Sequence, residues 1–112
     1  MKNFKKLNVF YTKEELDFRE KVHEFAENRI KPFNNELENN NYEPIKKLIR
    51  EMGKEKILGA LHPKKYGGIE MGMIGETIVA EEIARVSLAV DLSMIATIAL
   101  FGMPLQRFGT EE

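Results

Sequence analysis

Apolar residues dominate one stretch near the end of the chain, residues 84–105. Asp91 is the only charged residue between Arg85 and Arg107, although 31% of all residues are charged. A helix that is apolar on every side is normally buried on several sides. The pattern therefore predicts a central helix over 87–101 that the preceding helices enclose.

A first amphipathic helix precedes this stretch. Thr12 and Glu15 have the spacing of a capping box, in which each side chain bonds the backbone amide of the other residue. Apolar side chains then follow a helical period at Leu16, Val22, Phe25, Ala26, Ile30 and Phe33. Pro32 predicts that the helix ends near Ile30, and the polar run 34–41 predicts a loop.

A second helix is predicted to begin at Pro44, because proline suits the first turn of a helix. Its apolar face would consist of Ile45, Leu48, Ile49 and Met52. The apolar segment 57–61 is expected to pack beneath the helices. A long loop over 62–72 should follow, with a turn at Gly67 and Gly68.

A third helix should begin near Met73. Its apolar side is predicted to carry Ile74, Ile78, Val79, Ile83 and Val86, and its outer side Glu76, Glu81, Glu82 and Arg85. Ser87 can cap the central helix, and Pro104 should open a short final helix. Residues 110–112 resemble the start of another capped helix, which suggests a truncated chain.

These elements define an all-α fold, a helical bundle of about four to five helices without a convincing strand. We expect residues 1–11 to form an N-terminal tail and residues 12–112 to form one helical domain.

Charge and composition exclude several functions. Residues 1–65 carry 15 basic and 11 acidic groups (+4), while residues 66–112 carry 2 basic and 7 acidic groups (−5). This difference falls short of the clustered Lys and Arg residues that mark a nucleic-acid-binding surface. The chain has no cysteine and only two distant histidines, so we expect no metal site. The N-terminus lacks the apolar core of a secretory signal, and we expect a cytoplasmic protein. Polar residues and a predicted break at 102–104 argue against a membrane span.

No residues form a recognisable catalytic constellation. The Tyr66-Gly67-Gly68 segment suits a phosphate-binding nest, but a structural turn is the favoured interpretation. The three glutamates of the third helix lack the histidine partners of a di-iron site, so a solvated acidic face is favoured. His23 is expected at the surface or its boundary. Asp91 is expected to stabilise the start of its helix through the helix dipole.

Three motifs, in this order and spacing, carry a resemblance to a known family. They are YGG at 66–68, EEIAR at 81–85 and FGTEE at 108–112. Together with the opening helix YTKEELDFREKVHEFAENRIKP, they resemble the N-terminal helical domain of the acyl-CoA dehydrogenase family from about Tyr11 onward. Members of that family continue into a middle β-domain and a C-terminal α-domain, so the resemblance implies an N-terminal piece of a longer protein.

The resemblance implies a function that the residues alone do not name. Family members use FAD to dehydrogenate acyl-CoA thioesters, and the full-length enzyme is expected to be a homo-oligomer with an electron-transfer partner. The catalytic glutamate and the FAD contacts would lie outside this chain, which should therefore be inactive alone. Aligned on Met103 and Pro104, the substrate-binding positions would be Leu92, Ser93, Ala96 and Leu100, which form part of the acyl-pocket wall. The resemblance thus changes the expectation for the apolar helix: its near side should pack on the preceding helices, and its far side should face an acyl chain and further domains.

Two kinds of alternative stay open. An acyl-CoA oxidase or a flavin monooxygenase of the same fold would contain a similar domain. A stand-alone helical interaction module without catalysis would instead use the apolar helix to bind a partner.

Overall fold

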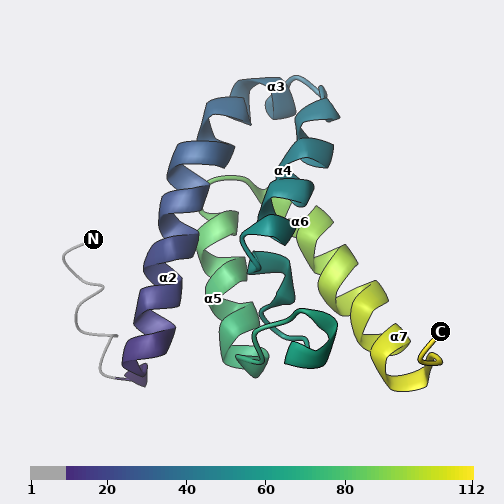
Figure 1. The fold of residues 1–112 in the computed structure, drawn as a ribbon. Helices are drawn as coiled ribbons and strands as arrows, with labels where there is room; N and C mark the ends of the chain where they lie inside the picture. The colour runs from purple at the N-terminus through teal and green to yellow at the C-terminus, as the bar shows by residue number, and fades with distance from the viewer. Residues whose placement is uncertain (1–9) are drawn as a thin grey trace.

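Helices make up most of the computed structural model, which describes residues 10–112 (Figure 1). The α-helices are α2 (Lys13–Phe25), α3 (Asn34–Glu38), α4 (Glu43–Lys54), α5 (Gly72–Ala84), α6 (Leu88–Ile95) and α7 (Met103–Phe108). Short 3-10 turns cover Lys31–Phe33, Ile57–Gly59 and Lys64–Tyr66, and π-helical turns cover Ala26–Ile30 and Ala96–Gly102. No strand occurs among these residues, which confirms the all-α prediction. Residues 1–9 of the predicted tail lie outside the described part.

The first helix begins at the predicted capping box. The amide of Thr12 donates to Glu15 Oε2 at 2.8 Å, and the amide of Glu15 donates to Thr12 Oγ1 at 3.2 Å. The helical path does not stop at Ile30 but continues through the Pro32 turn into α3. The loop predicted over 34–41 is therefore wrong for Asn34–Glu38.

Two contacts explain the extra helix α3. Leu37 is buried in the core, and the Asn34 side chain donates a 2.9 Å hydrogen bond to the carbonyl of Val86. Local composition did not show either contact, because each depends on a distant part of the chain. An apolar anchor and one hydrogen bond thus outweigh the weak helix propensity of a run rich in asparagine.

The second helix, α4, has Pro44 in its first turn and buries Leu48 and Met52, as predicted. The chain reverses after α4 at Lys56, whose φ of 62° is left-handed. The following segment places Ile57 and Ala60 in the core, with no exposed surface at either side chain. The apolar segment 57–61 is therefore packed beneath the helices as expected.

Helix α5 lies between α2 and α6 and packs against both (Figure 1). For this reason a single apolar stripe does not describe its buried surface. Ile78, Val79 and Ile83 are fully buried, but Glu76 and Glu82 are also only 8% and 2% exposed. The prediction of an outer acidic side is wrong for these two glutamates.

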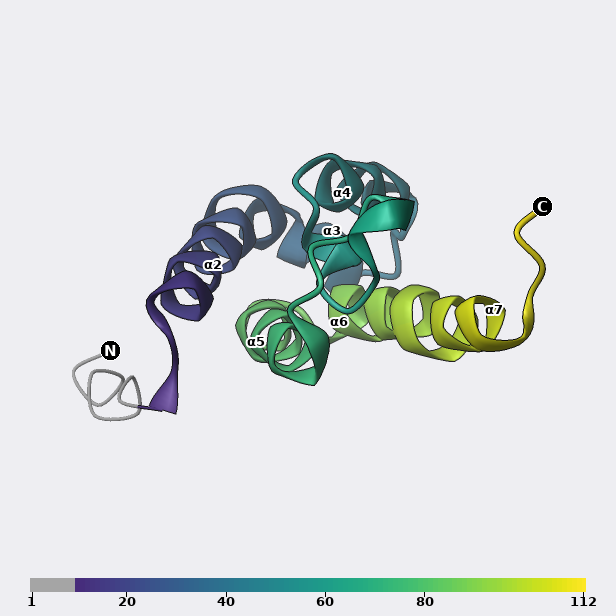
Figure 2. The same cartoon turned by 60° about the horizontal axis from the view of Figure 1, so that its bottom comes forward.

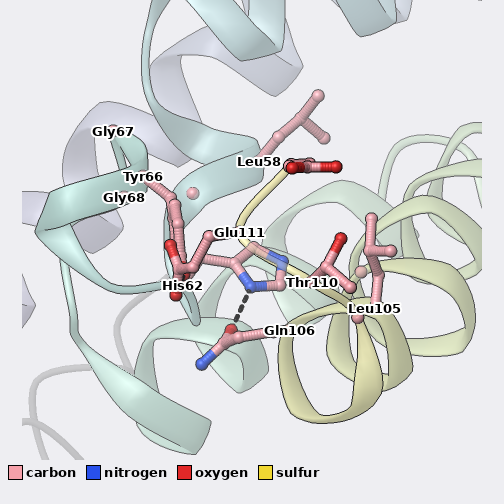
Figure 3. A pocket seen from close by; sticks show the side chains of 13 residues that line it. Leu58, His62, Tyr66, Gly67, Gly68, Leu105, Gln106, Thr110 and Glu111 are labelled. Carbon is pink, nitrogen blue, oxygen red and sulfur yellow. Dashed lines mark hydrogen bonds between the residues drawn. The ribbon is translucent and has the colours of Figure 1, made fainter.

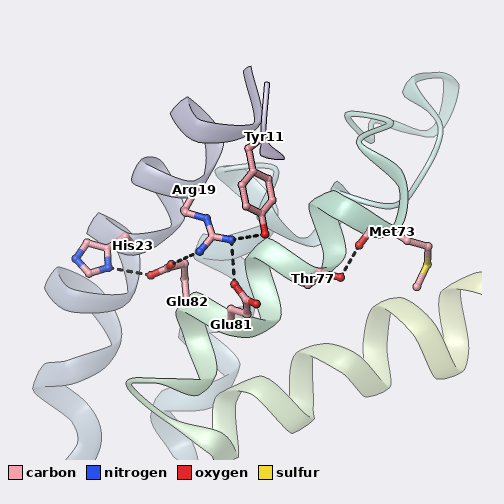
Figure 4. A network of polar contacts seen from close by, with 7 residues as sticks. All are labelled: Tyr11, Arg19, His23, Met73, Thr77, Glu81 and Glu82. Atoms are coloured by element: carbon pink, nitrogen blue, oxygen red, sulfur yellow. Dashed lines mark hydrogen bonds and ion pairs between the residues drawn. The ribbon is translucent and has the colours of Figure 1, made fainter. Parts of the chain in front are cut away.

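A network of charged side chains joins α2 to the C-terminal part of α5 (Figure 4). Arg19 is 3.2 Å from Glu82 through its Nη1 atom and 2.9 Å from Glu81 through its Nη2 atom. His23 Nδ1 lies 2.9 Å from the other Glu82 oxygen, and Arg19 also donates to the Tyr11 hydroxyl. The buried carboxylate of Glu82 is thereby paired at both oxygens, and His23 is the boundary residue that we expected.

The apolar stretch forms one unbroken helical rod from α6 to α7. Ser87 caps it, with its Oγ accepting a 3.3 Å bond from the amide of Val90. The predicted break at 102–104 is wrong, because the π-helical turn Ala96–Gly102 leads directly into α7. Pro104 has no amide hydrogen, and a change in hydrogen-bond register before it lets the helix continue. Residues 110–112, a predicted helix start, are not helical.

The rod is covered on one side only. Val90, Met94 and Ile98 join the core, whereas Leu92 and Leu100 are 59% and 73% exposed. In both views the rod projects away from the other helices toward the C-terminus (Figures 1 and 2). The enclosure predicted from the apolar pattern alone is therefore wrong, whereas packing on the near side only, which the resemblance implies, is observed. Within residues 10–112 the rod, Leu88–Phe108, is long and apolar enough to cross a membrane by length and composition alone.

The Arg19 network yields a stability prediction. Replacement of Arg19 by methionine (R19M) should lower the free energy of unfolding by about 3 kcal/mol, because it leaves the Glu82 carboxylate buried with one partner fewer. Urea unfolding followed by circular dichroism measures the change. Lys46→Met is the matched control, since Lys46 pairs with Glu43 at the exposed surface and should matter little. Equal losses in the two variants would contradict the assignment.

Candidate functional site

The predicted substrate-binding residues lie along the rod. Leu92, Ala96 and Leu100 follow one another at four-residue spacing and are exposed, and Ser93 beside them is half-buried. The Ser93 hydroxyl donates to the carbonyl of Ala89 at 2.9 Å, so its proton is bound within the helix. The four residues therefore present a surface that is almost entirely apolar.

The exposed apolar surface is larger than the sequence predicted. Beyond the four predicted positions, it includes four further side chains of the rod, Leu88, Phe101, Leu105 and Phe108. We call these eight positions together the outer face of the rod. Helical periodicity did not identify the additional residues, because every side of the rod is apolar in sequence. The packing of α6 against α5 and α4, and of the turn Ala96–Gly102 against Ile57–Gly59, shows which side is covered.

An open cleft of about 630 Å³ lies between the loop that follows α4 and the C-terminal segment, and Leu105 of the outer face is one of its lining residues (Figure 3). His62 reaches across it, with Nδ1 2.9 Å from Gln106 Oε1. Glu111 accepts a 2.9 Å hydrogen bond from the Tyr66 hydroxyl and lies 3.4 Å from Lys65 Nζ. The cleft is thus spanned by contacts between its two walls.

These contacts shift two ionisation equilibria in the direction of an ion pair. The hydrogen bond from Tyr66, followed by that from Lys65, lowers the pKa of Glu111. The hydrogen bond with Tyr66, followed by that with Glu111, raises the pKa of Lys65. Because Lys65 and Glu111 are exposed, water screens their attraction, and they contribute little to stability.

The Tyr66-Gly67-Gly68 segment forms a turn. The amide of Gly67 donates to the carbonyl of Lys64 at 2.9 Å, and the amide of Gly68 donates to that of Pro63 at 3.0 Å. Gly67 has a left-handed φ of 87°, and a Cβ atom at Gly68 would overlap the carbonyl oxygen of His62. The favoured interpretation of a structural turn is confirmed, because the amides that a phosphate nest would offer are already bonded.

Comparisons with known proteins identify the family of this helical domain. The family profile of the acyl-CoA dehydrogenase N-terminal domain matches residues 12–112. The chain therefore belongs to the acyl-CoA dehydrogenase family, whose N-terminal domain it represents.

Individual relatives agree with this assignment. The probable acyl-CoA dehydrogenase YngJ of Bacillus subtilis is 31% identical over 106 residues, which is 95% of this chain and 28% of that protein. The mitochondrial isovaleryl-CoA dehydrogenase of Solanum tuberosum is 34% identical over 94% of this chain and 26% of its own length. The 3-(aryl)acrylate reductase of Clostridium sporogenes is 28% identical over 93% of this chain and 27% of its own length. The chain thus spans about a quarter of these relatives. No solved structure gave a significant match.

The family is FAD-dependent, but the cleft beside His62 does not fit the diphosphate of a flavin dinucleotide. Two carboxylates, Glu111 and Glu112, line this cleft and would repel that diphosphate. The amides of Gly67 and Gly68, which a diphosphate would need, are bonded within the turn. Among residues 10–112 there is also no group of three or more side chains that could hold a metal ion.

Two glycines should respond to alanine in opposite directions. Gly68→Ala should destabilise the protein by about 2 kcal/mol, because its methyl group would overlap the backbone of His62. Gly53→Ala should stabilise α4 by up to about 1 kcal/mol, because Gly53 is helical and its nearest neighbour, Leu58 Cδ1, is 3.8 Å from the new Cβ. Thermal unfolding of both variants tests the pair. A gain of stability in Gly68→Ala would contradict the described turn, and a loss in Gly53→Ala would contradict the open space beside Gly53 in α4.

The outer face of the rod should promote self-association of the 112-residue chain. The double variant Leu92→Glu with Leu100→Glu should sediment as a smaller species and keep its free energy of unfolding within about 0.5 kcal/mol, because both side chains are exposed. The control adds the same charges elsewhere, at the exposed residues Asn28 and Asn35. Sedimentation velocity over a range of concentrations makes the comparison. If the control dissociates equally, net charge and not the outer face governs association.

Proposed function

We propose that this chain is the N-terminal domain of an FAD-dependent acyl-CoA dehydrogenase and supplies part of the wall of its acyl pocket. The reaction would be the α,β-dehydrogenation of acyl-CoA thioesters. One observation carries the proposal. The helix that bears Leu92, Ser93, Ala96 and Leu100 is anchored in the core on one side and presents an unpaired apolar face on the other.

The chemistry of that face suits an acyl chain. Each methylene that leaves water for an apolar wall contributes about 0.8 kcal/mol to binding. Leu92 and Leu100 supply aliphatic surface, and Ala96 between them leaves space for a chain to approach. Because the Ser93 hydroxyl is already bonded to Ala89, an acyl chain would leave no donor unsatisfied there.

The rest of the proposed activity depends on groups that the described residues do not offer. The cleft beside His62 does not suit the flavin, and the outer face of the rod carries no side chain that could act as a base. We propose that the 112 residues alone bind no flavin and catalyse no dehydrogenation. Acyl-CoA, an electron-transfer partner and homo-oligomeric assembly would belong to the whole enzyme. A cytoplasmic location remains a prediction from the sequence.

A second candidate is a stand-alone interaction module, and the exposure of the same outer face favours it. An acyl-CoA oxidase or a flavin monooxygenase of the same fold is a narrower alternative within the enzyme class. The module and the enzyme domain differ in what occupies the face, which is protein in one case and an acyl chain in the other. A membrane-spanning role for the rod would instead make the face contact lipid.

A chimaeric enzyme tests the proposal. Residues 12–112 would replace the matching segment of the Solanum tuberosum isovaleryl-CoA dehydrogenase, and kcat/KM would be measured over acyl-CoA substrates of increasing length. Ala96→Phe should lower kcat/KM for the longest accepted substrate by at least about tenfold, because the ring takes the place of the chain end, which costs about 1.4 kcal/mol or more. The shortest substrate should be affected least.

Ala84→Phe is the matched control for this experiment. Ala84 is exposed at the end of α5 and receives the same change in size away from the outer face. It should leave the preference for chain length unchanged. An active chimaera in which Ala96→Phe and Ala84→Phe behave alike would refute the pocket-wall assignment and favour the interaction module.

A further inference from the structure

Two acidic side chains, Glu76 on α5 and Asp91 on α6, are buried where these helices meet. They are only 8% and 5% exposed. Glu76 Oε2 and Asp91 Oδ1 are inaccessible to solvent, and neither has a hydrogen-bond partner among the described residues. Most buried polar atoms in proteins are hydrogen-bonded, so two neighbouring exceptions require an explanation.

The two carboxyl groups cannot both keep a charge at low cost in this position. Burial is the largest factor that raises the pKa of Glu76, and the charge of Asp91 raises it further. Burial also raises the pKa of Asp91, which lies in the first turn of α6. A carboxyl group that holds a proton avoids this cost.

The other charged groups around the pair do not neutralise it. From the loop after Ile57–Gly59, His62 lowers the pKa of Glu76, but this is the weakest of the three influences. From α2, Arg19 and His23 are engaged by Glu81 and Glu82, about two turns further along α5.

On α4, the charged side chains with partners form ion pairs elsewhere. Glu51 pairs with Arg29 and Lys47, and Glu43 pairs with Lys46, while Arg50 is exposed. Among residues 10–112 no group of three or more potential ligands surrounds a metal site. A proton is therefore the positive charge that remains available to the pair.

We propose that Glu76 and Asp91 form a proton-holding carboxyl pair that makes the anchoring of the rod to α5 depend on pH. In the folded protein the pair retains a proton at pH values where the unfolded chain has already lost it. This contribution to stability is fully present below the ordinary pKa range of the two carboxyls, and it is lost as pH rises through their higher folded values. The junction between α5 and α6 thus loosens as pH rises above the ordinary range of the two carboxyls.

This device is independent of the proposed enzymatic function, because it requires only the contact between α5 and α6. It has a consequence for the outer face, since Asp91 lies on the same helix as Leu92 and Ser93. A change in the anchoring at Asp91 would shift the start of that face relative to the core.

Carboxyl-detected NMR titration of the 112-residue chain tests the proposal directly. We expect Glu76 and Asp91 to titrate above the ordinary range for their residue types. Asp91→Asn should lower the Glu76 midpoint, because the neighbouring negative charge is removed. Glu20→Gln, at an exposed residue of α2, is the control variant and should leave the Glu76 and Asp91 midpoints where they are. Ordinary midpoints for both buried groups, or a Glu76 midpoint that Asp91→Asn does not move, would overturn the proposal.

Denaturant unfolding at pH 5 and pH 8 gives a second readout. Each protein is compared with itself at the two pH values, so a variant that is less stable at both can still be used. The wild-type urea midpoint should be lower at pH 8 than at pH 5. That difference should shrink in Glu76→Gln and in Asp91→Asn, because the amides carry no charge to bury, and it should persist in the matched control Glu20→Gln. A difference that is the same in all four proteins would show that the pair does not hold the proton.

Discussion

The buried ion pair between Arg19 and Glu82 places two charged groups out of water at 3.2 Å, with side chains only 9% and 2% exposed. Such a pair tolerates little displacement, since separation would leave a buried charge without its partner. It therefore fixes α2 along one side of α5. Another side of α5 is then available to α6, and the rod that begins there is covered on its inner side alone.

This arrangement separates stability from function along one helix. The inner residues Val90, Met94 and Ile98 fasten the rod to the core, and they alternate with exposed residues that add nothing to that core. A rigid helix with an uncovered apolar face is a suitable wall for an apolar ligand, because its shape is set before the ligand arrives. The match to the acyl-CoA dehydrogenase N-terminal domain over residues 12–112 connects this shape to a family of enzymes that act on acyl thioesters.

Signals that act within a few residues were predictable from the sequence. The capping box at Thr12, the proline at the start of α4, the cap at Ser87 and the glycine turn all appear as expected. Features that depend on distant partners were not. The burial of Glu82 requires Arg19, and α3 requires the carbonyl of Val86. The exposed side of the rod was not readable from residue type, because its inner and outer sides are equally apolar; the four wall positions came from the family resemblance and remain a prediction.

The most direct test of the central claim is a crystal structure of the chimaeric enzyme with an acyl-CoA bound. The account predicts that carbon atoms of the acyl chain lie within about 4 Å of the side chains of Leu92, Ala96 and Leu100, with no protein between them. An acyl chain bound elsewhere, with these three side chains covered by another part of the polypeptide, would contradict it.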